Sequence, residues 1–199
     1  MIHMSPVDEP IEVVAARPEW QAQGQVLRME VCDALGMDPA CVEHIGSTAV
    51  AELAAKPVID LMVGCRDDQR HPVAELLAHR VGYEYLHDFG APGREYLRRR
   101  TGSPWANAHI VELGGTLWRD NLMLRDFLRG DPEAAREYGA AKKAAAVRTG
   151  HLRAYSAAKS DTVLTLLDRA RAWSRRCEAP LGLWANGSDE RPFRMGQAG

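Results

Sequence analysis

The sequence predicts an α+β fold in which a mixed β-sheet is flanked by helices. Short apolar segments bounded by glycine or proline recur between positions 11 and 113, as expected for strands, with helical segments among them. From position 116 onward the apolar residues instead recur at helical spacing. The segment 57–64 is almost continuously apolar, which is typical of an interior strand. We therefore expect the C-terminal helices to pack on a sheet formed earlier in the chain.

The individual strands and helices follow from the same patterns. Strands are expected at 11–15, 42–46, 57–64, 83–87, 95–100 and 108–113, the fourth and fifth forming a hairpin around 90–93. Helices are expected from Pro18 to Gly36, at 47–55, from Pro72 to Gly82, at 116–129, from Pro132 to Gly150 and at 152–175. Proline in the first turn and glycine just after the last turn mark most of these helix ends.

Length and charge limit the domain organisation and the partners. The 199 residues suffice for one sizeable core, so we expect one domain over 11–178, a mobile N-terminus over 1–10 and a mobile tail over 179–199. A net charge of −2 provides no general attraction to nucleic acid or anionic lipid, and no apolar segment reaches the roughly 18 residues of a membrane span. We therefore expect a small-molecule ligand rather than a nucleic-acid or membrane partner.

The cysteines and the N-terminus indicate a reducing compartment. Cys32, Cys41, Cys65 and Cys177 show no C-x-x-C spacing and no clustering with histidine, which is typical of free buried thiols. The first ten residues contain no apolar core of a signal peptide. We therefore expect a cytoplasmic protein.

A strand, a Gly-Ser pair, a short helix and a second strand with an aspartate occur between positions 42 and 64. Gly46 would let the backbone approach a phosphate closely, and Ser47 and Thr48 would add hydroxyl groups at a helix N-terminus that attracts anions. Asp60, on the second strand, would hold Mg²⁺ against the phosphates. The alternative for Gly46 and Ser47 is an ordinary turn with a helix cap.

Asp60 needs a partner because it lies inside a strand expected to be buried, where an unpaired charge is very costly. That partner is either a metal or ligand, or a structural ion pair with Lys56, Arg99 or Lys159. Lys159 falls on the apolar face of the helix expected at 152–175. It therefore either extends to the surface or reaches into a polar pocket as a phosphate or carboxylate partner.

Other side chains are weaker candidates for the same pocket. His44 and His109 alternate with apolar residues on short strands, which is more typical of hydrogen-bonded core histidines than of catalytic ones. Glu112 is a candidate catalytic group and second metal ligand, and Glu43 is a weaker candidate because it is expected to face away from His44. Arg99 would bind phosphate if its side chain faces the pocket.

The arrangement around Gly46 and Asp60 is similar to that of nucleotidyltransferases of the polymerase-β type, and the longer pattern resembles the GrpB-like family over about residues 11–170. The segments that carry the resemblance are 11–13, 18–20, 42–50 (VEHIGSTAV), 53–61 (LAAKPVIDL), 109–112 (HIVE), 124–128 (LRDFL) and 155–161 (YSAAKSD). The resemblance implies a nucleotidyltransferase-like fold. The family occurs alone and fused to a dephospho-CoA kinase, which points to nucleotide or coenzyme metabolism.

One departure from the wider superfamily bears on catalysis. Active nucleotidyltransferases carry a second carboxylate two residues after the first, and here that position is Met62, whose thioether is a poor Mg²⁺ ligand. Asn107 stands where the family commonly has a histidine. Two functions follow from the resemblance: Mg²⁺-dependent transfer of a nucleotidyl group to a small molecule, with Asp60, Glu112 and Lys159 catalytic, or nucleotide or coenzyme binding without transfer.

Overall fold

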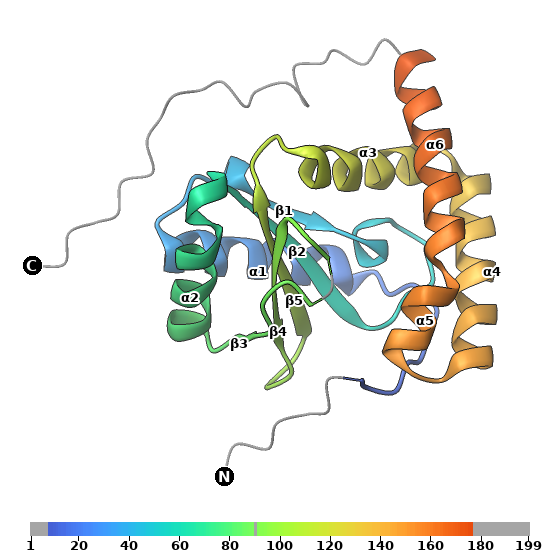
Figure 1. Cartoon of the computed structure of the whole chain (residues 1–199). Helices are drawn as coiled ribbons and strands as arrows, with labels where there is room; N and C mark the ends of the chain where they lie inside the picture. Colours follow the sequence, from blue (N-terminus) through green and yellow to red (C-terminus); the bar gives the residue numbers. More distant parts are fainter. Residues whose placement is uncertain (1–7, 90, 177–199) are drawn as a thin grey trace, which may run out of the picture.

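The chain forms a five-stranded mixed β-sheet (Figure 1). The computed structural model describes residues 8–89 and 91–176. The strands are β1 (Val42–Ile45), β2 (Val58–Cys65), β3 (Glu84–Tyr85), β4 (Arg94–Arg99) and β5 (Trp105–Glu112). Their order is β1-β2-β5-β4-β3, with β2 and β5 parallel and the other neighbours antiparallel. The predicted α+β class is confirmed, and β2 is an interior strand.

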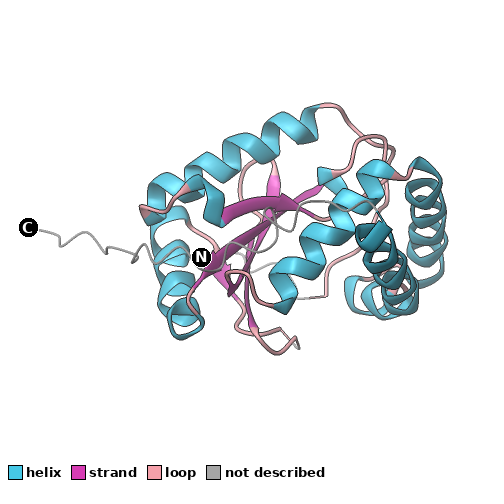
Figure 2. Cartoon of the chain, turned by 90° about the horizontal axis from the view of Figure 1, so that it is seen from above, coloured by secondary structure: helices cyan, strands magenta, loops and turns pink. Residues whose placement is uncertain are grey.

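Helices lie on both sides of this sheet, as Figure 2 shows. They are α1 (Glu19–Leu35), α2 (Arg70–Val81), α3 (Thr116–Gly130), α4 (Pro132–Thr149), α5 (Leu152–Ala158) and α6 (Ser160–Arg176). Short 3-10 helices occur at Pro39–Cys41, Ser47–Ala49 and Asp67–Gln69. The start of α4 is set locally, because the Asp131 carboxylate accepts a hydrogen bond of 2.9 Å from the Ala134 N–H and Pro132 occupies the first turn.

The two faces of the sheet carry different side chains because successive residues of a strand point to opposite faces. On one face, Leu61 and Ile110 pack in the core cluster that includes α1 and α2. On the other face, Asp60 is opposite Asn107, and Met62 is opposite His109, in the register of β2 and β5. The polar side chains of the central strands therefore gather on the face that α1 and α2 leave uncovered.

The C-terminal helices build a second layer over this polar face. Trp118 and Leu122 of α3 pack against Ile45 and Met62, which fixes α3 on the sheet. Helices α4 and α6 run side by side across the end of α3 (Figure 1) and share a separate apolar cluster with it. That cluster also contains Val50 and Leu53 from the segment between β1 and β2.

Three predicted elements differ in the structure. The segment 11–15 is not a strand of the sheet. The Ile11 N–H donates to the Gly150 carbonyl, whereas Val14 exchanges two backbone hydrogen bonds with Ala55, so the segment connects two separate parts of the chain. The helix expected at 47–55 is a single 3-10 turn. Its alanine-rich sequence favours a helix locally, but Val50 is extended and Glu52 is left-handed (φ 62°) where this segment packs against the C-terminal helices.

The helix expected at 152–175 is divided into α5 and α6 at Lys159. The Ser160 hydroxyl donates a hydrogen bond of 3.0 Å to the Ser156 carbonyl across the junction, a contact with the residue four positions earlier that is known to bend helices. This junction changes the position of Lys159, which lies between two helices rather than on the apolar face of one.

Some expectations concern parts of the chain beyond the described residues. Gly90 in the predicted hairpin turn, the expected mobile tail 179–199 and Cys177 lie outside them. Cys32, Cys41 and Cys65 are free thiols. Within residues 8–89 and 91–176, every helix is too short or too polar to cross a lipid bilayer.

Gly24 of α1 determines how closely this helix approaches the sheet. A Cβ atom added at Gly24 would lie 2.2 Å from Nδ1 of His44, far inside van der Waals contact. We therefore expect Gly24→Ala to lower the free energy of unfolding by about 1–3 kcal/mol, although alanine is the better helix former by about 1 kcal/mol. Urea unfolding measures this, with the exposed Gln25→Ala as control and Gly24→Ala/His44→Ala expected to recover part of the loss. A stabilised Gly24→Ala variant would contradict this packing.

Candidate functional site

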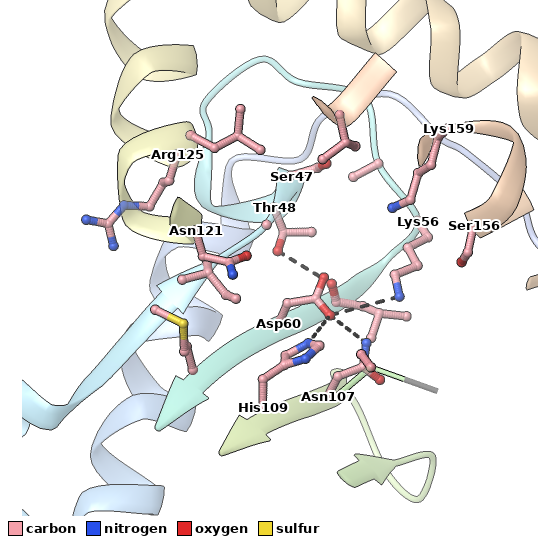
Figure 3. A pocket seen from close by; sticks show the side chains of 18 of the residues that line it. Ser47, Thr48, Lys56, Asp60, Asn107, His109, Asn121, Arg125, Ser156 and Lys159 are labelled. Atoms are coloured by element: carbon pink, nitrogen blue, oxygen red, sulfur yellow. Dashed lines mark hydrogen bonds and ion pairs between the residues drawn. The ribbon is translucent and has the colours of Figure 1, made fainter. Parts of the chain in front are cut away.

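A cavity of about 610 Å³ lies between the polar face of the sheet and helices α3 to α6 (Figure 3). Its floor comes from β2 and β5, and its walls come from the Gly46–Thr48 turn and the helices. The ionisable side chains that line it, tyrosines aside, are Lys56, Asp60, Arg94, His109, Arg125, Lys142 and Lys159. Asp60 is therefore the only carboxylate among the described residues that line the pocket.

Asp60 projects from β2 into the pocket and is surrounded by positive and donor groups (Figure 3). Its Oδ1 atom accepts a hydrogen bond of 2.5 Å from Asn107 Nδ2 and lies 3.9 Å from Lys56 Nζ and 3.6 Å from His109 Nε2. Burial raises the pKa of Asp60, but the Lys56 ammonium and the hydrogen bonds from His109 and Asn107 outweigh it and hold this pKa well below its usual range. Asp60 is therefore ionised at any working pH.

His109 and Asn107 are held in place by arginines at the edge of the pocket. Arg94 lies 3.4 Å from Nδ1 of His109, and an arginine can only donate, so the neutral ring carries its proton on Nε2, toward Asp60. Burial lowers the pKa of His109 and outweighs the attraction of Asp60, which keeps the ring neutral. Asn107 accepts a hydrogen bond of 3.0 Å from Arg100 while donating to Asp60, so its orientation is fixed.

Gly46 makes room for Asp60 as well as turning the chain. It has φ 70° and ψ −166°, a conformation that only glycine adopts readily, and an added Cβ would lie 2.9 Å from Oδ2 of Asp60. Ser47 and Thr48 line the pocket, but the Thr48 hydroxyl is buried against His44 Nε2 (3.0 Å) and the Val58 carbonyl. The three-residue helix that follows Gly46 is too short for the helix-terminus anion site that the sequence suggested.

Lys142 is a buried amine that the sequence interpretation missed. The residue is only 1% exposed, and its Nζ atom has no hydrogen-bond partner among the described residues. The same Nζ atom lies 4.6 Å from the centre of the Tyr138 ring. Burial, followed by repulsion from Lys159, lowers the pKa of Lys142 to about 6, so this amine is mostly neutral at pH 7.

Lys159 reaches into the pocket from the junction of α5 and α6, opposite Lys56 (Figure 3). Burial, followed by repulsion from Lys56, lowers the pKa of Lys159 to about 8, and its Nζ atom lies 5.1 Å from the centre of the Tyr155 ring. The structure thus places Lys159 in the pocket, and it is Lys56 that forms the ion pair with Asp60.

Two predicted site residues lie away from the pocket. Arg99 faces α1, where it forms two hydrogen bonds (2.8 and 3.2 Å) with the Glu30 carboxylate, because its strand position points to the opposite face from Asp60. Glu112 is exposed at the end of β5 and pairs in register with Cys65, on the face opposite Asp60. The expected placement of Arg99 and Glu112 beside Asp60 is therefore corrected, because neither side chain lines the pocket.

His44 and Glu43 also have structural partners. His44 is buried beneath Gly24, and burial lowers its pKa to about 4, which makes it the hydrogen-bonded core histidine that the sequence favoured. Glu43 does point away from His44, as predicted, and forms an ion pair of 2.7 Å with Arg125 of α3. Because Arg125 also donates to the His44 carbonyl, this arginine mainly ties α3 to β1.

The side chains of the pocket do not fit the magnesium site of an active nucleotidyltransferase. Two-metal catalysis needs clustered carboxylates. Here Met62 and His109 are the neighbours of Asp60 along the floor, and no group of three acidic, histidine or cysteine side chains that could hold a metal occurs in the described part of the chain. The Asp60 carboxylate is instead surrounded by a lysine, an amide and an imidazole.

The sequence pattern contains evidence for two pocket residues that were not predicted, Lys142 and Asn107. Lys142 follows Tyr138 and Gly139 and precedes Ala145 and Ala146 at helical spacing, so it lies on the buried face of α4. Asn107 shares the alternating pattern of β5 with His109. The approach of Lys142 to Lys159, in contrast, depends on how two separate helices pack.

The chain is similar to a known protein family and to individual proteins of bacteria. The profile of the family described as GrpB protein matches residues 10–169. The UPF0157 protein YqkA of Bacillus subtilis is 25% identical over 176 residues, a match that covers 88% of this chain and 51% of YqkA. A UPF0157 protein of Streptomyces coelicolor is 36% identical over 151 residues, covering 74% of this chain and 77% of that protein.

Two further similarities concern a longer protein and a solved structure. The dephospho-CoA kinase of Mycolicibacterium paratuberculosis is 31% identical over 196 residues, covering 83% of this chain and 47% of the kinase. This chain therefore spans about half of that kinase and about half of YqkA. The crystal structure of the conserved protein GrpB from Enterococcus faecalis superimposes with a TM-score of 0.69 and 31% identity, over 81% of this chain and 99% of that one.

Lys142→Met keeps a long apolar side chain but removes the buried amine. We expect it to raise the free energy of unfolding at pH 7 by an amount on the order of 3 kcal/mol. The pKa of Lys142 is about 6 when folded against 10.5 when unfolded, so the unfolded chain binds the extra proton and native stability rises with pH across this window. Denaturant unfolding between about pH 6.5 and 9 should show a shallower rise in the variant.

The neighbouring residue supplies the control for this experiment. Lys143 is exposed on the same helix, so Lys143→Met should change neither the stability nor its dependence on pH. An unchanged pH dependence in Lys142→Met would show that this amine is charged and partnered in the folded protein.

Proposed function

Since this chain belongs to the GrpB family, we propose that its pocket binds a phosphate-bearing small molecule, a nucleotide or a nucleotide-containing coenzyme, without a metal ion. The observation that carries this proposal is the excess of basic side chains over carboxylates. Within the described part of the chain, five lysine or arginine residues line the pocket together with a single carboxylate. Such a cavity is suited to an anion.

The existing ion pairs leave part of this positive charge for a ligand. Lys56 is paired with Asp60, and Arg125 is paired with Glu43 and Asp126. Lys142 and Lys159 have aromatic rings nearby but no carboxylate within ion-pair distance among the described residues. The end of the pocket formed by α4 and the α5–α6 junction is therefore where an anionic group would gain most.

The size and the remaining walls of the pocket suit the rest of such a ligand. Its volume of about 610 Å³ lies within the usual range of small-molecule sites, about 300–1,000 Å³. Phe89, Tyr96, Tyr138 and Tyr155 supply aromatic surface, and Ser156 and Asn121 supply hydrogen-bonding groups. Aromatic rings offer planar faces on which a base can stack. The similarity to a protein named dephospho-CoA kinase gives independent support for a nucleotide or coenzyme ligand.

Calorimetric titration with ATP, GTP, CTP and coenzyme A, with Mg²⁺ or with EDTA, tests the proposal. We expect at least one of these compounds to bind with the same affinity under both conditions. We expect Asp60→Asn to strengthen binding severalfold, because removal of the carboxylate frees Lys56 for the phosphate.

The competing function, Mg²⁺-dependent nucleotidyl transfer, gives the opposite results. Binding that requires Mg²⁺ and is abolished by Asp60→Asn would replace the present proposal with that reaction. Glu112→Gln is the matched control, because Glu112 lies on the other face of the sheet and its substitution should leave binding unchanged. Absence of binding by all four compounds would overturn the proposal.

A further inference from the structure

We infer that Lys142 takes up a proton when the ligand binds and becomes the buried counter-charge of the ligand's phosphate group. This inference rests on the proposed function and deepens it, because it assigns the phosphate to one end of the pocket. The amine gains a proton from solvent as the phosphate arrives, with no other bond made or broken. Binding at neutral pH would then depend on pH mainly through this side chain.

The surroundings of Lys142 carry the inference. Its side chain lines the pocket from α4, is 1% exposed, and ends in an amine without a hydrogen-bond partner in the described structure. A buried polar group without a partner is costly and rare in folded proteins. An acceptor supplied by a ligand at this end of the pocket would satisfy the amine.

The groups that face this amine explain why it changes protonation state. Lys159 and Lys56 repel a positive charge at Lys142, whereas Asp60 attracts one, and burial disfavours the charged form most. Burial also raises the pKa of Tyr138, to about 12, and the pKa of Tyr155 rises with burial as well, so neither phenol supplies a negative charge at neutral pH. The free pocket therefore holds Lys142 mostly in its neutral form.

A phosphate group reverses this balance. Its negative charge would replace the missing counter-charge in a site of low dielectric constant, where an opposite charge a few Å away favours the ammonium strongly. Lys159, whose pKa is about 8, already carries most of its positive charge at pH 7. The uptake of a proton at neutral pH is thus assigned mainly to Lys142.

Calorimetry at pH 7 in buffers with different ionisation enthalpies measures the number of protons taken up. The probes are inorganic diphosphate, ATP, GTP, CTP and coenzyme A, so that recognition of free phosphate, nucleotide and coenzyme can be distinguished. For a probe that binds, we expect the wild-type protein to take up about one more proton per bound ligand than Lys142→Met. Comparison of the two proteins cancels any proton exchange by the phosphate itself.

The pH dependence of the affinity gives a second readout. Wild-type affinity should fall about tenfold per unit between about pH 7 and 8, and the fall should be clearly smaller in Lys142→Met. Lys143→Met, on the exposed side of α4, should behave as the wild type does.

The possible failures are distinguishable. Binding with equal proton uptake in wild type and Lys142→Met would overturn this inference and leave the proposed function intact. Failure of every probe to bind the wild type, with stability measurements showing it folded, would overturn both.

Discussion

The Asp60 carboxylate on an interior strand is the constraint on which the rest of the site depends. A charge at this depth is tolerable only with partners, and the structure supplies Lys56, Asn107 and His109 around one oxygen atom. Two of these partners are themselves held by arginines, since Arg100 orients Asn107 and Arg94 orients His109. The polar floor of the pocket is therefore one connected network.

The sheet separates an apolar core on one face from the polar pocket on the other, because apolar and polar residues alternate along its central strands. Apolar residues of β2 and β5 point toward α1 and α2 and form the main core, while the polar residues between them point toward the pocket. A glycine provides space for a side chain on each face of the sheet. Gly24 leaves room for His44 beneath α1, and Gly46 leaves room for the Asp60 carboxylate beside the turn. Both positions exclude a Cβ for a steric reason.

The C-terminal helices convert this polar face into a cavity lined with basic side chains. Helix α3 is fixed to the sheet through apolar packing and through Arg125, and α4 to α6 then carry Lys142 and Lys159 over the floor. Burial lowers the pKa of both lysines, and repulsion adds to it, from Lys159 and Lys56 at Lys142 and from Lys56 at Lys159. Among the described residues, basic side chains thus outnumber carboxylates in the pocket lining, and Met62 lies on its floor.

The sequence by itself determined the α+β class, most helix ends, the burial of Asp60 and its position beside the Gly46 turn, because these depend on local spacing and on the cost of burying a charge. It indicated Lys159 as a pocket residue but missed Lys142, and it wrongly placed Arg99 and Glu112 there. Only the tertiary structure decided those cases. The face to which a strand residue points depends on the register of the whole sheet, and the meeting of Lys142 with Lys159 depends on how α4 packs against the α5–α6 junction.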